Sequence, residues 1–355
     1  MKILFVSSGN NKFGISPIVK AQGESLKAAG VEVEYFTVVG KGYKGYLKNI
    51  FRLRKHLKKN KYDIVHSHFF LSSVVATFAN PKKLVVSLMG SDAYTSRLWN
   101  CLIKIFANRW DAVIVKSEKM KDILGLSNCN VLPNGVDFEK FYPIDKEIAR
   151  EKLGWNNHKY VLFASSTNRP EKNFELASEA VELLNDKEIE LDTLQDIPHD
   201  LIVYYLNAAD VLLMTSKYEG SPNIIKEAMA CNCPIVSTDV GDVKWVIGGT
   251  DGCYLISKKI NDKKPALSLS KGKKTQSELI KETTDKLRHK SKKIDKSKSR
   301  SADVKAVTSG IKEALEFAEK IGRTKGRERI IELKLDSENV AAVILNIYAK
   351  TLNES

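Results

Sequence analysis

Two glutamates eight positions apart, Glu219 and Glu227, stand in the stretch EGSPNIIKEAMACNCP at residues 219–234. Pro222 suits the first turn of a helix, so Glu219 falls in the preceding loop and Glu227 inside the helix. A carboxylate that accepts two hydrogen bonds reads a vicinal diol well. One carboxylate can therefore hold a ribose and the other a second sugar, while the free N–H groups of the helix start meet a phosphate between them.

A second group of candidates follows the predicted strand KYVLFA, in the stretch SSTNRPEKNFELA at residues 165–177. Ser165, Arg169 and Lys172 stand there at the entry of a helix. Cations and unpaired backbone N–H groups at such a position make a site for a diphosphate. The alternative is a solvated loop, which is the more common interpretation of two basic residues taken alone.

The first third of the chain offers a glycine-containing loop, SSGNNKFGISP, between a predicted strand and a helix that starts at Pro17. Gly9 and Gly14 in this loop suit an anion or a sugar hydroxyl at the helix N-terminus. The pattern is not GxGxxG, so it fails as a dinucleotide-binding fingerprint. A plain tight turn is the alternative.

Two histidines and an aspartate follow the next predicted strands. His66 and His68 lie on the same face of a strand because side chains at i and i+2 point to the same side. They could bind a metal, but no third ligand is evident, and contact with a sugar or phosphate is the preferred interpretation. Asp92 follows the strand KLVVSL at residues 83–88, next to Gly90, which allows a close approach.

Apolar runs that alternate with amphipathic helical stretches must position these residues. The alternation indicates parallel, doubly wound sheets, and Pro133, Asn134-Gly135 and Pro143 interrupt it in mid-chain. Because ligands of such sheets bind at the carboxyl ends of the strands, two Rossmann-like domains would face each other across a cleft. The predicted domains are 1–140, 141–335 with an insertion at 258–300, and a helix at 336–355 that returns to the first domain.

Charge is concentrated in one segment of the 355-residue chain. The net charge is +14, and residues 258–300 hold 16 Lys or Arg against 5 Asp or Glu. This Lys- and Ser-rich segment predicts a disordered insertion. A nucleic-acid module is the alternative, but no aromatic residues are interleaved, so no nucleic-acid partner is expected.

The expected location is the cytoplasm, because no run of eighteen apolar residues and no signal peptide is evident, and the five cysteines fit a reducing compartment. The basic stretch FRLRKHLKKNK at residues 51–61 adds a possible membrane contact. It predicts either an ordinary packed helix with a solvated basic face or a peripheral contact with an anionic membrane.

The glutamate stretch resembles the E-x7-E signature of retaining glycosyltransferases of family four, which have the GT-B fold. Further matches are GISP, DIVHSH, PNGVD, RPEKN, GRERI and the long block from Asn207 to Asp242. The resemblance covers nearly the whole chain except the lysine-rich insertion. The sequence departs from the family pattern at Thr167, Met89 and Phe13-Gly14.

The resemblance implies a role for each candidate. Glu227 would hold the nucleotide ribose, Glu219 the donor sugar, and Arg169 and Lys172 the diphosphate, with Glu219, Lys172 and Arg169 as the catalytic group. The remaining donor-binding positions would be Ser165, Gly220, Ser221, Pro222, Asn223 and Ile224. The acceptor-side positions would be Gly14, His66, His68 and Asp92.

The sequence thus predicts a retaining hexosyltransferase that moves a sugar from a nucleotide-diphosphate sugar to a saccharide or lipid-linked acceptor. The resemblance places such enzymes in cell-surface polysaccharide or glycolipid synthesis at the inner face of the membrane. Cations and a helix N-terminus can stabilise the leaving diphosphate, so no cofactor or metal is expected. The alternatives are a sugar-nucleotide epimerase of the same fold and a catalytically degenerate nucleotide-sugar-binding protein.

Overall fold

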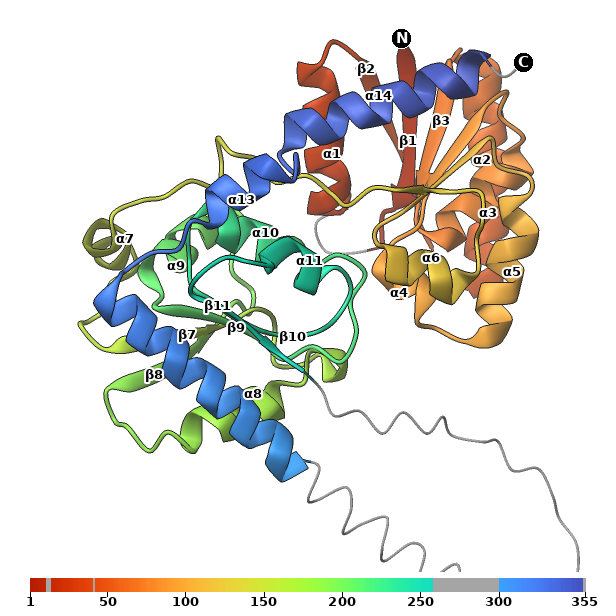
Figure 1. Cartoon of the computed structure of the whole chain (residues 1–355). Helices are drawn as coiled ribbons and strands as arrows, with labels where there is room; N and C mark the ends of the chain where they lie inside the picture. Colours follow the sequence, from red (N-terminus) through yellow and green to blue (C-terminus); the bar gives the residue numbers. More distant parts are fainter. Residues whose placement is uncertain (11–13, 41, 258–299, 354–355) are drawn as a thin grey trace, which may run out of the picture.

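The computed structural model describes residues 1–10, 14–40, 42–257 and 300–353. It contains two parallel α/β units, as the sequence predicted. In Figure 1 the first sheet is red to orange and the second green, and the darkest blue helix, the last of the chain, lies against the first unit. The predicted insertion lies outside the described residues except for Arg300.

The first unit is built on a six-stranded sheet in the order β2-β1-β3-β4-β5-β6. Every pairing in it is parallel, and the four central strands are short runs of mostly buried residues because helices cover both faces. The strands are β1 (Lys2–Ser8), β2 (Glu32–Val38), β3 (Ile64–His68), β4 (Leu84–Ser87), β5 (Ala112–Val115) and β6 (Asn130–Val131). The helices are α1 (Pro17–Ala28), α2 (Gly42–Lys59), α3 (Phe70–Ala79), α4 (Gly90–Ala93), α5 (Arg97–Ala107) and α6 (Glu118–Leu124).

The two faces of this sheet have separate cores. Leu53 of α2, Val75 of α3 and Ile103 of α5 are fully buried with Val6 on one face. The other face packs against α1 and against α14 (Ser337–Asn353), the last helix of the chain.

The second unit is built on a five-stranded parallel sheet in the order β11-β10-β9-β7-β8. Its strands are β7 (Lys159–Phe163), β8 (Ile189–Thr193), β9 (Val211–Met214), β10 (Ile235–Thr238) and β11 (Cys253–Ile256). Its helical segments are α7 (Lys146–Leu153), η1 (Pro170–Lys172), α8 (Phe174–Glu182), α9 (Ile202–Ala208), α10 (Asn223–Ala230), α11 (Val243–Ile247), a helix that includes residues 300–320, and α13 (Gly326–Glu332).

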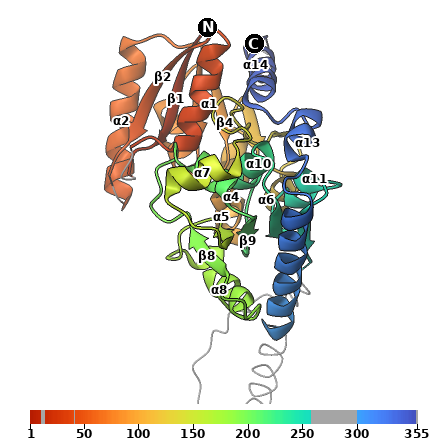
Figure 2. The same cartoon turned by 90° about the vertical axis from the view of Figure 1, so that its left-hand side faces the viewer.

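The C-terminal helix returns to the first unit, as the sequence predicted. Ile344 and Tyr348 of α14 are fully buried in one cluster with Ile3 and Phe5 of β1. Both views show α14 leaving the second unit and ending beside the N-terminus (Figures 1 and 2).

The chain crosses between the two units twice, and the crossings lie side by side. Val136 forms a parallel bridge with Asp336. A Cβ added to Gly135 would come within 2.7 Å of the Cα atom of Ser337, so only glycine allows this approach. The predicted domain limits at 140 and 335 lie in these two crossings.

Candidate active site

The loops that follow the strands of the two sheets meet at their carboxyl ends. A Cβ on Gly90, after β4, would lie 2.5 Å from the amide nitrogen of Gly220, after β9. The rings of Tyr94 and Tyr218 stack across the same boundary with centroids 5.0 Å apart. The backbones of the two units therefore touch directly beside Glu219.

Glu219 is paired with Lys172. The Nζ atom of Lys172 lies 2.5 Å from Oε1 of Glu219, and the two side chains are 13% and 17% exposed. The hydroxyl of Thr215 donates to the carbonyls of Lys172 and Asn173, each at 3.0 Å, and thereby ties η1 to the end of β9. Asn173 adopts the left-handed conformation that turns the chain from η1 into α8. The structure thus brings these two predicted catalytic residues together.

Arg169 does not join this pair. Its Nε atom donates to Glu171 at 2.7 Å, and its side chain is 55% exposed. Thr167, where the family pattern has its arginine, donates from its hydroxyl to Gln195 at 2.7 Å. Ser165 lies half-buried at the start of the same loop.

Glu227 lies inside α10, as the sequence predicted, and is 8% exposed. Its Oε1 atom lies 3.3 Å from Nε2 of His199, whose Nδ1 atom contacts the Lys140 ammonium at 2.8 Å. The ring of Phe141 packs edge-on against His199. Sequence patterns did not indicate His199 or Lys140, because they come from two loops with no motif of their own.

The start of α10 contains the other predicted donor-side residues. Pro222 is the N-cap residue, and Asn223 accepts a hydrogen bond from the Asn134 side chain of the interdomain crossing at 3.3 Å. The buried Lys226 donates to the hydroxyl of Ser221 at 2.6 Å. Burial lowers the pKa of Lys226, while the charges of Asp242 and Glu227 oppose that shift. Ile224 is half-buried and packs against the core of the second unit.

His66 has a different place from the one expected. It is fully buried, and its ring nitrogens bond to the Tyr348 hydroxyl at 2.6 Å and to the Ser87 hydroxyl at 2.8 Å. Both hydrogen-bonding positions of the ring are therefore used within the fold. In this structure His66 joins the sheet to α14 rather than facing an acceptor.

The remaining acceptor-side candidates differ in their surroundings. His68 is buried and bonds through Nε2 to the Gln22 side chain at 2.7 Å. Asp92 accepts from the backbone amides of Met89 at 2.8 Å and Phe70 at 3.3 Å, so it braces the loop after β4. Burial raises the pKa of the Asp92 carboxyl to about 6. Gly14 has a φ of +72°, and a Cβ there would meet no atom of the described residues within 4 Å.

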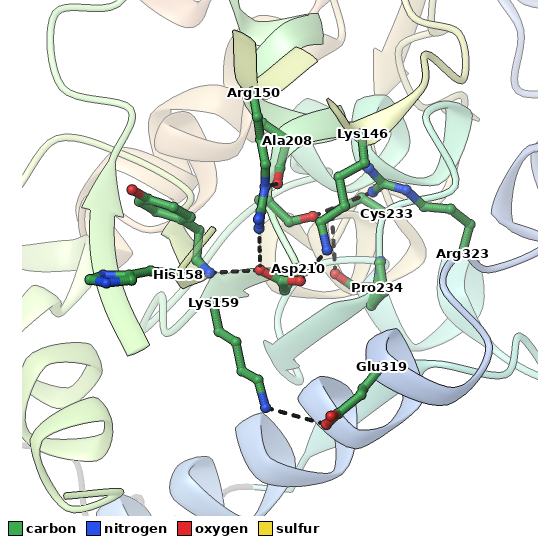
Figure 3. Close-up of polar contacts among 12 residues, drawn as sticks. Lys146, Arg150, His158, Lys159, Ala208, Asp210, Cys233, Pro234, Glu319 and Arg323 are labelled. Carbon is green, nitrogen blue, oxygen red and sulfur yellow. Dashed lines mark hydrogen bonds and ion pairs between the residues drawn. The ribbon is translucent and has the colours of Figure 1, made fainter. Parts of the chain in front are cut away.

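A third polar cluster lies at the other end of the second sheet. Asp210, directly before β9, pairs with Lys146 and, at 2.8 Å, with Arg150, both from α7 (Figure 3). The same carboxylate accepts from the backbone amide of Tyr160 at 2.7 Å. The cluster joins α7 to the amino ends of β7 and β9, so its place indicates a structural role.

A hollow in the first unit also lies at the amino ends of the strands. It has a volume of about 710 Å³ and is lined by residues that include Lys104, Asp111, Asn130 and Lys350. Asp111 directly precedes β5, at the opposite end from the loops that meet Gly220. Within the described part of the chain, no group of three His, Cys, Asp or Glu residues is placed to hold a metal ion.

Comparisons with known proteins agree with this geometry. The sequence model of Glycosyltransferase Family 4 matches residues 14–140, and that of Glycosyl transferases group 1 matches residues 193–266. An Escherichia coli protein, UDP-Gal:alpha-D-GlcNAc-diphosphoundecaprenol alpha-1,3-galactosyltransferase, is 27% identical over 265 residues, which cover 61% of this chain and 67% of that protein.

Solved structures share the fold. Sucrose-phosphate synthase from Thermosynechococcus elongatus superposes with a TM-score of 0.69 and 16% identity, and each chain is fully covered. Anabaena Alr3699/HepE in complex with UDP and glucose gives a TM-score of 0.64 and 16% identity, with 99% of this chain and all of that chain covered. The E-x7-E stretch at the meeting point of two Rossmann-like units, together with both family matches, establishes that the chain is a glycosyltransferase of family 4 with the GT-B fold.

Proposed function

We propose that the chain transfers a hexose from a nucleotide-diphosphate sugar to a saccharide or lipid-linked acceptor, with retention of the anomeric configuration. The Lys172–Glu219 pair carries this proposal, since it stands beside the start of α10 with Glu227 eight residues further on. A carboxylate and an ammonium paired across two neighbouring loops can hold a sugar hydroxyl and a phosphate oxygen of the same donor.

The roles follow from these positions. Glu227 accepts hydrogen bonds from the ribose diol, and Glu219 holds the transferred sugar. Lys172 then moves from Glu219 to the leaving diphosphate, where Arg169 and the N–H groups of α10 add further stabilisation. Arg169 is exposed, and its side chain bonds to the neighbouring Glu171, so it can swing toward a bound donor. These groups can stabilise the leaving group without a metal ion.

Uridine diphosphate sugars are the first donors to test. The Escherichia coli relative is named for UDP-galactose, and the Anabaena structure contains UDP. Thermal-shift screening of UDP-, GDP-, TDP- and CDP-sugars should select one nucleotide. Turnover of that donor with and without an acceptor then separates the candidate functions, because an epimerase converts the donor alone and a degenerate binding protein does neither.

A lipid-linked acceptor is favoured by the name of the Escherichia coli relative, which acts on a diphosphoundecaprenol sugar. Such an acceptor requires an enzyme that reaches a membrane surface. Among the described residues, no helix is long and apolar enough to cross a membrane. We therefore propose a peripheral contact at the cytoplasmic face of the cell membrane.

The outer surface of helices α2, α3 and α5 fits that contact. These helices cover one face of the first sheet, and their outward side chains include Phe51, Phe78, Leu98 and Ile105, exposed by 62%, 44%, 73% and 58%. Exposed cations of α2 accompany them: Arg52, Arg54, Lys55, Lys58 and Lys59. Apolar side chains surrounded by cations favour an anionic lipid surface, to which each cation contributes about 1 kcal/mol.

Sedimentation with phosphatidylglycerol vesicles tests the membrane contact. Residues 258–300 are themselves basic, so a variant without them is compared with the full chain. Changing Arg54, Lys55, Lys58 and Lys59 to Ser should abolish salt-sensitive binding by the shortened variant. Changing Lys20 and Lys27 of α1 to Ser is the matched control. If the shortened variant ignores these vesicles at low salt, the acceptor is soluble.

A further inference from the structure

Lys116 is a buried cation to which the proposed function assigns no role. It follows β5 directly, and its side chain is 1% exposed. The strand alternation places it on the same face as Ile114, two residues earlier. Ile114 is paired with Ser87, which is paired with His68 in turn, so Lys116 projects beyond His68 at the carboxyl end of the sheet. That end faces the second unit.

The ammonium of Lys116 has no hydrogen-bond partner in the part of the chain that the structure describes. Burial lowers the pKa of Lys116 to about 7, and the charge of Lys226 from α10 adds to the shift. No carboxylate in the described part of the chain contributes to that pKa, so Lys116 lies close to another cation and has no counter-ion.

A second buried donor belongs to the same end of the sheet. Gln22 of α1 is 8% exposed and bonds through Oε1 to His68, and its Nε2 atom has no partner among the described residues. Burial lowers the pKa of the His68 ring to about 3, and the charge of Lys116 adds to that shift. Lys116 and Gln22 therefore approach the same histidine from two elements, each with a donor unused.

Burying an ammonium without a partner is costly, and a buried amide without its hydrogen bonds adds to the cost. Charge-assisted bonds to one anion would satisfy both donors. We propose that Lys116, together with Gln22 and Lys226, forms an anion-binding subsite between the two units that holds a phosphate or diphosphate group of the acceptor. This inference rests on the proposed function.

The acceptor is a better source of this anion than the donor. Lys116 and Gln22 belong to the first unit, whereas the candidates for the donor diphosphate, Lys172 and Arg169, lie on the loop after β7 of the second. Lys226 is the one member on the donor side, and it already donates to Ser221. An anion at Lys116 would lie across the cleft from the donor. Its entry requires the Gly90–Gly220 contact to separate.

Calorimetry with inorganic pyrophosphate tests the subsite. The full chain is first saturated with the nucleoside diphosphate that it binds, chosen from UDP, GDP, TDP and CDP, so that the donor site is filled. Pyrophosphate should then bind at one further site. Lys116→Met, which keeps the length and removes the charge, should weaken that second binding at least about tenfold. Lys119→Met, an exposed lysine of the adjacent α6, is the matched control.

Four outcomes would overturn the inference in different ways. Equal pyrophosphate binding by Lys116→Met, or none by the nucleotide-saturated wild type, removes the subsite. Displacement of the nucleotide by pyrophosphate, with weaker nucleotide binding by Lys116→Met, assigns the lysine to the donor. Failure to bind any nucleotide rejects the proposed function itself.

Thermal unfolding distinguishes a binding role from a structural one. A lysine that only packs the core would give a Met variant with altered stability and unchanged pyrophosphate affinity. A lysine whose role is to bind an anion gives the opposite pair of results. Lys116→Met then melts at the same or a higher temperature and loses the binding of pyrophosphate at the second site.

Discussion

At the scale of single residues, the two glutamates of the site have different partners. Glu219 has its partner ready in Lys172, while Glu227 contacts a half-exposed histidine. A donor can displace both contacts without breaking the core. The two glutamates can therefore be tested separately.

Glu227→Ala should weaken binding of the nucleotide, because the ribose diol loses a charged acceptor worth roughly 1.5–3 kcal/mol. Calorimetry with the selected nucleoside diphosphate measures this as a loss of about tenfold to a hundredfold in affinity. Glu151→Ala, an exposed glutamate of α7, is the control. Unchanged affinity would remove Glu227 from the ribose site.

Lys172→Met should reduce kcat far more than stability, because its ammonium bonds to Glu219 in the loops after β7 and β9 rather than to the core. Loss of one preorganised charge on a leaving group typically costs about 2.7–4 kcal/mol of transition-state stabilisation. Steady-state kinetics with Lys187→Met as the exposed control would measure it. A large drop in Tm with full specific activity would contradict the assignment.

The buried ammonium of Lys116 should make stability depend on pH. Its folded pKa of about 7 lies below the ordinary value of 10.5. Between these values the unfolded chain holds a proton that the folded chain lacks, so stability rises with pH, by up to about 1.4 kcal/mol per unit.

Urea unfolding near pH 7 and near pH 9 checks this. Lys116→Met has no buried ammonium, so it avoids the free-energy cost of burying that charge. It should be more stable than the wild type near pH 7, and the difference should shrink near pH 9. The pKa of the facing Lys226 is lowered in the same direction, but it is present in both proteins and largely cancels. A difference that grows with pH would show that the folded protein does not disfavour the charge.

At the scale of elements, the charged residues at the carboxyl ends of the second sheet belong to the candidate site, whereas those at its amino ends hold the fold together. The Asp210 cluster joins α7, β7 and β9 with three bonds to one carboxylate. The arrangement resembles a buried ion pair, in which removal of one partner leaves the other charges buried without a counter-ion.

Asp210→Ala should therefore lower the free energy of unfolding by about 3–5 kcal/mol, since two cations lose their partner. Urea unfolding measures this change. A variant that still folds should bind the nucleotide as the wild type does, because the cluster lies at the amino ends of the strands. Weakened nucleotide binding at full stability would place the cluster in the site.

At the scale of the whole molecule, the two units meet through glycines. A Cβ on Gly220 would lie 2.5 Å from the Cα atom of Gly90 in the other unit. Within the second unit, a Cβ on Gly241 would lie 2.5 Å from the Gly220 carbonyl oxygen. The closest approach of the units thus depends on missing side chains beside the catalytic pair.

Gly220→Ala should hold the units apart and lower kcat while each unit keeps its fold. Small-angle scattering should show a larger radius of gyration, and circular dichroism should be unchanged. Gly90→Ala should act in the same way from the other side. Wild-type turnover by both variants would mean that this contact is not needed for transfer.

The sequence by itself determined the alternating elements, the loop position of Glu219 and the helical position of Glu227, because these depend on local periodicity and on a proline. It did not predict β8, whose residues IELDT are all half-buried and alternate between apolar and polar. It also misjudged His66, because a histidine within a strand looks the same in the sequence whether it faces a ligand or, as here in β3, a core.

Only the tertiary structure decided which residues meet across long separations. Tyr348 is 282 positions from His66, and Lys172 is 47 from Glu219. Lys116 gave no signal in the sequence, since one lysine after a strand is ordinarily solvated. Its burial depends on helices and a second unit distant in the chain. Local sequence sets each residue's conformation, whereas desolvation and partnership depend on everything that packs around it.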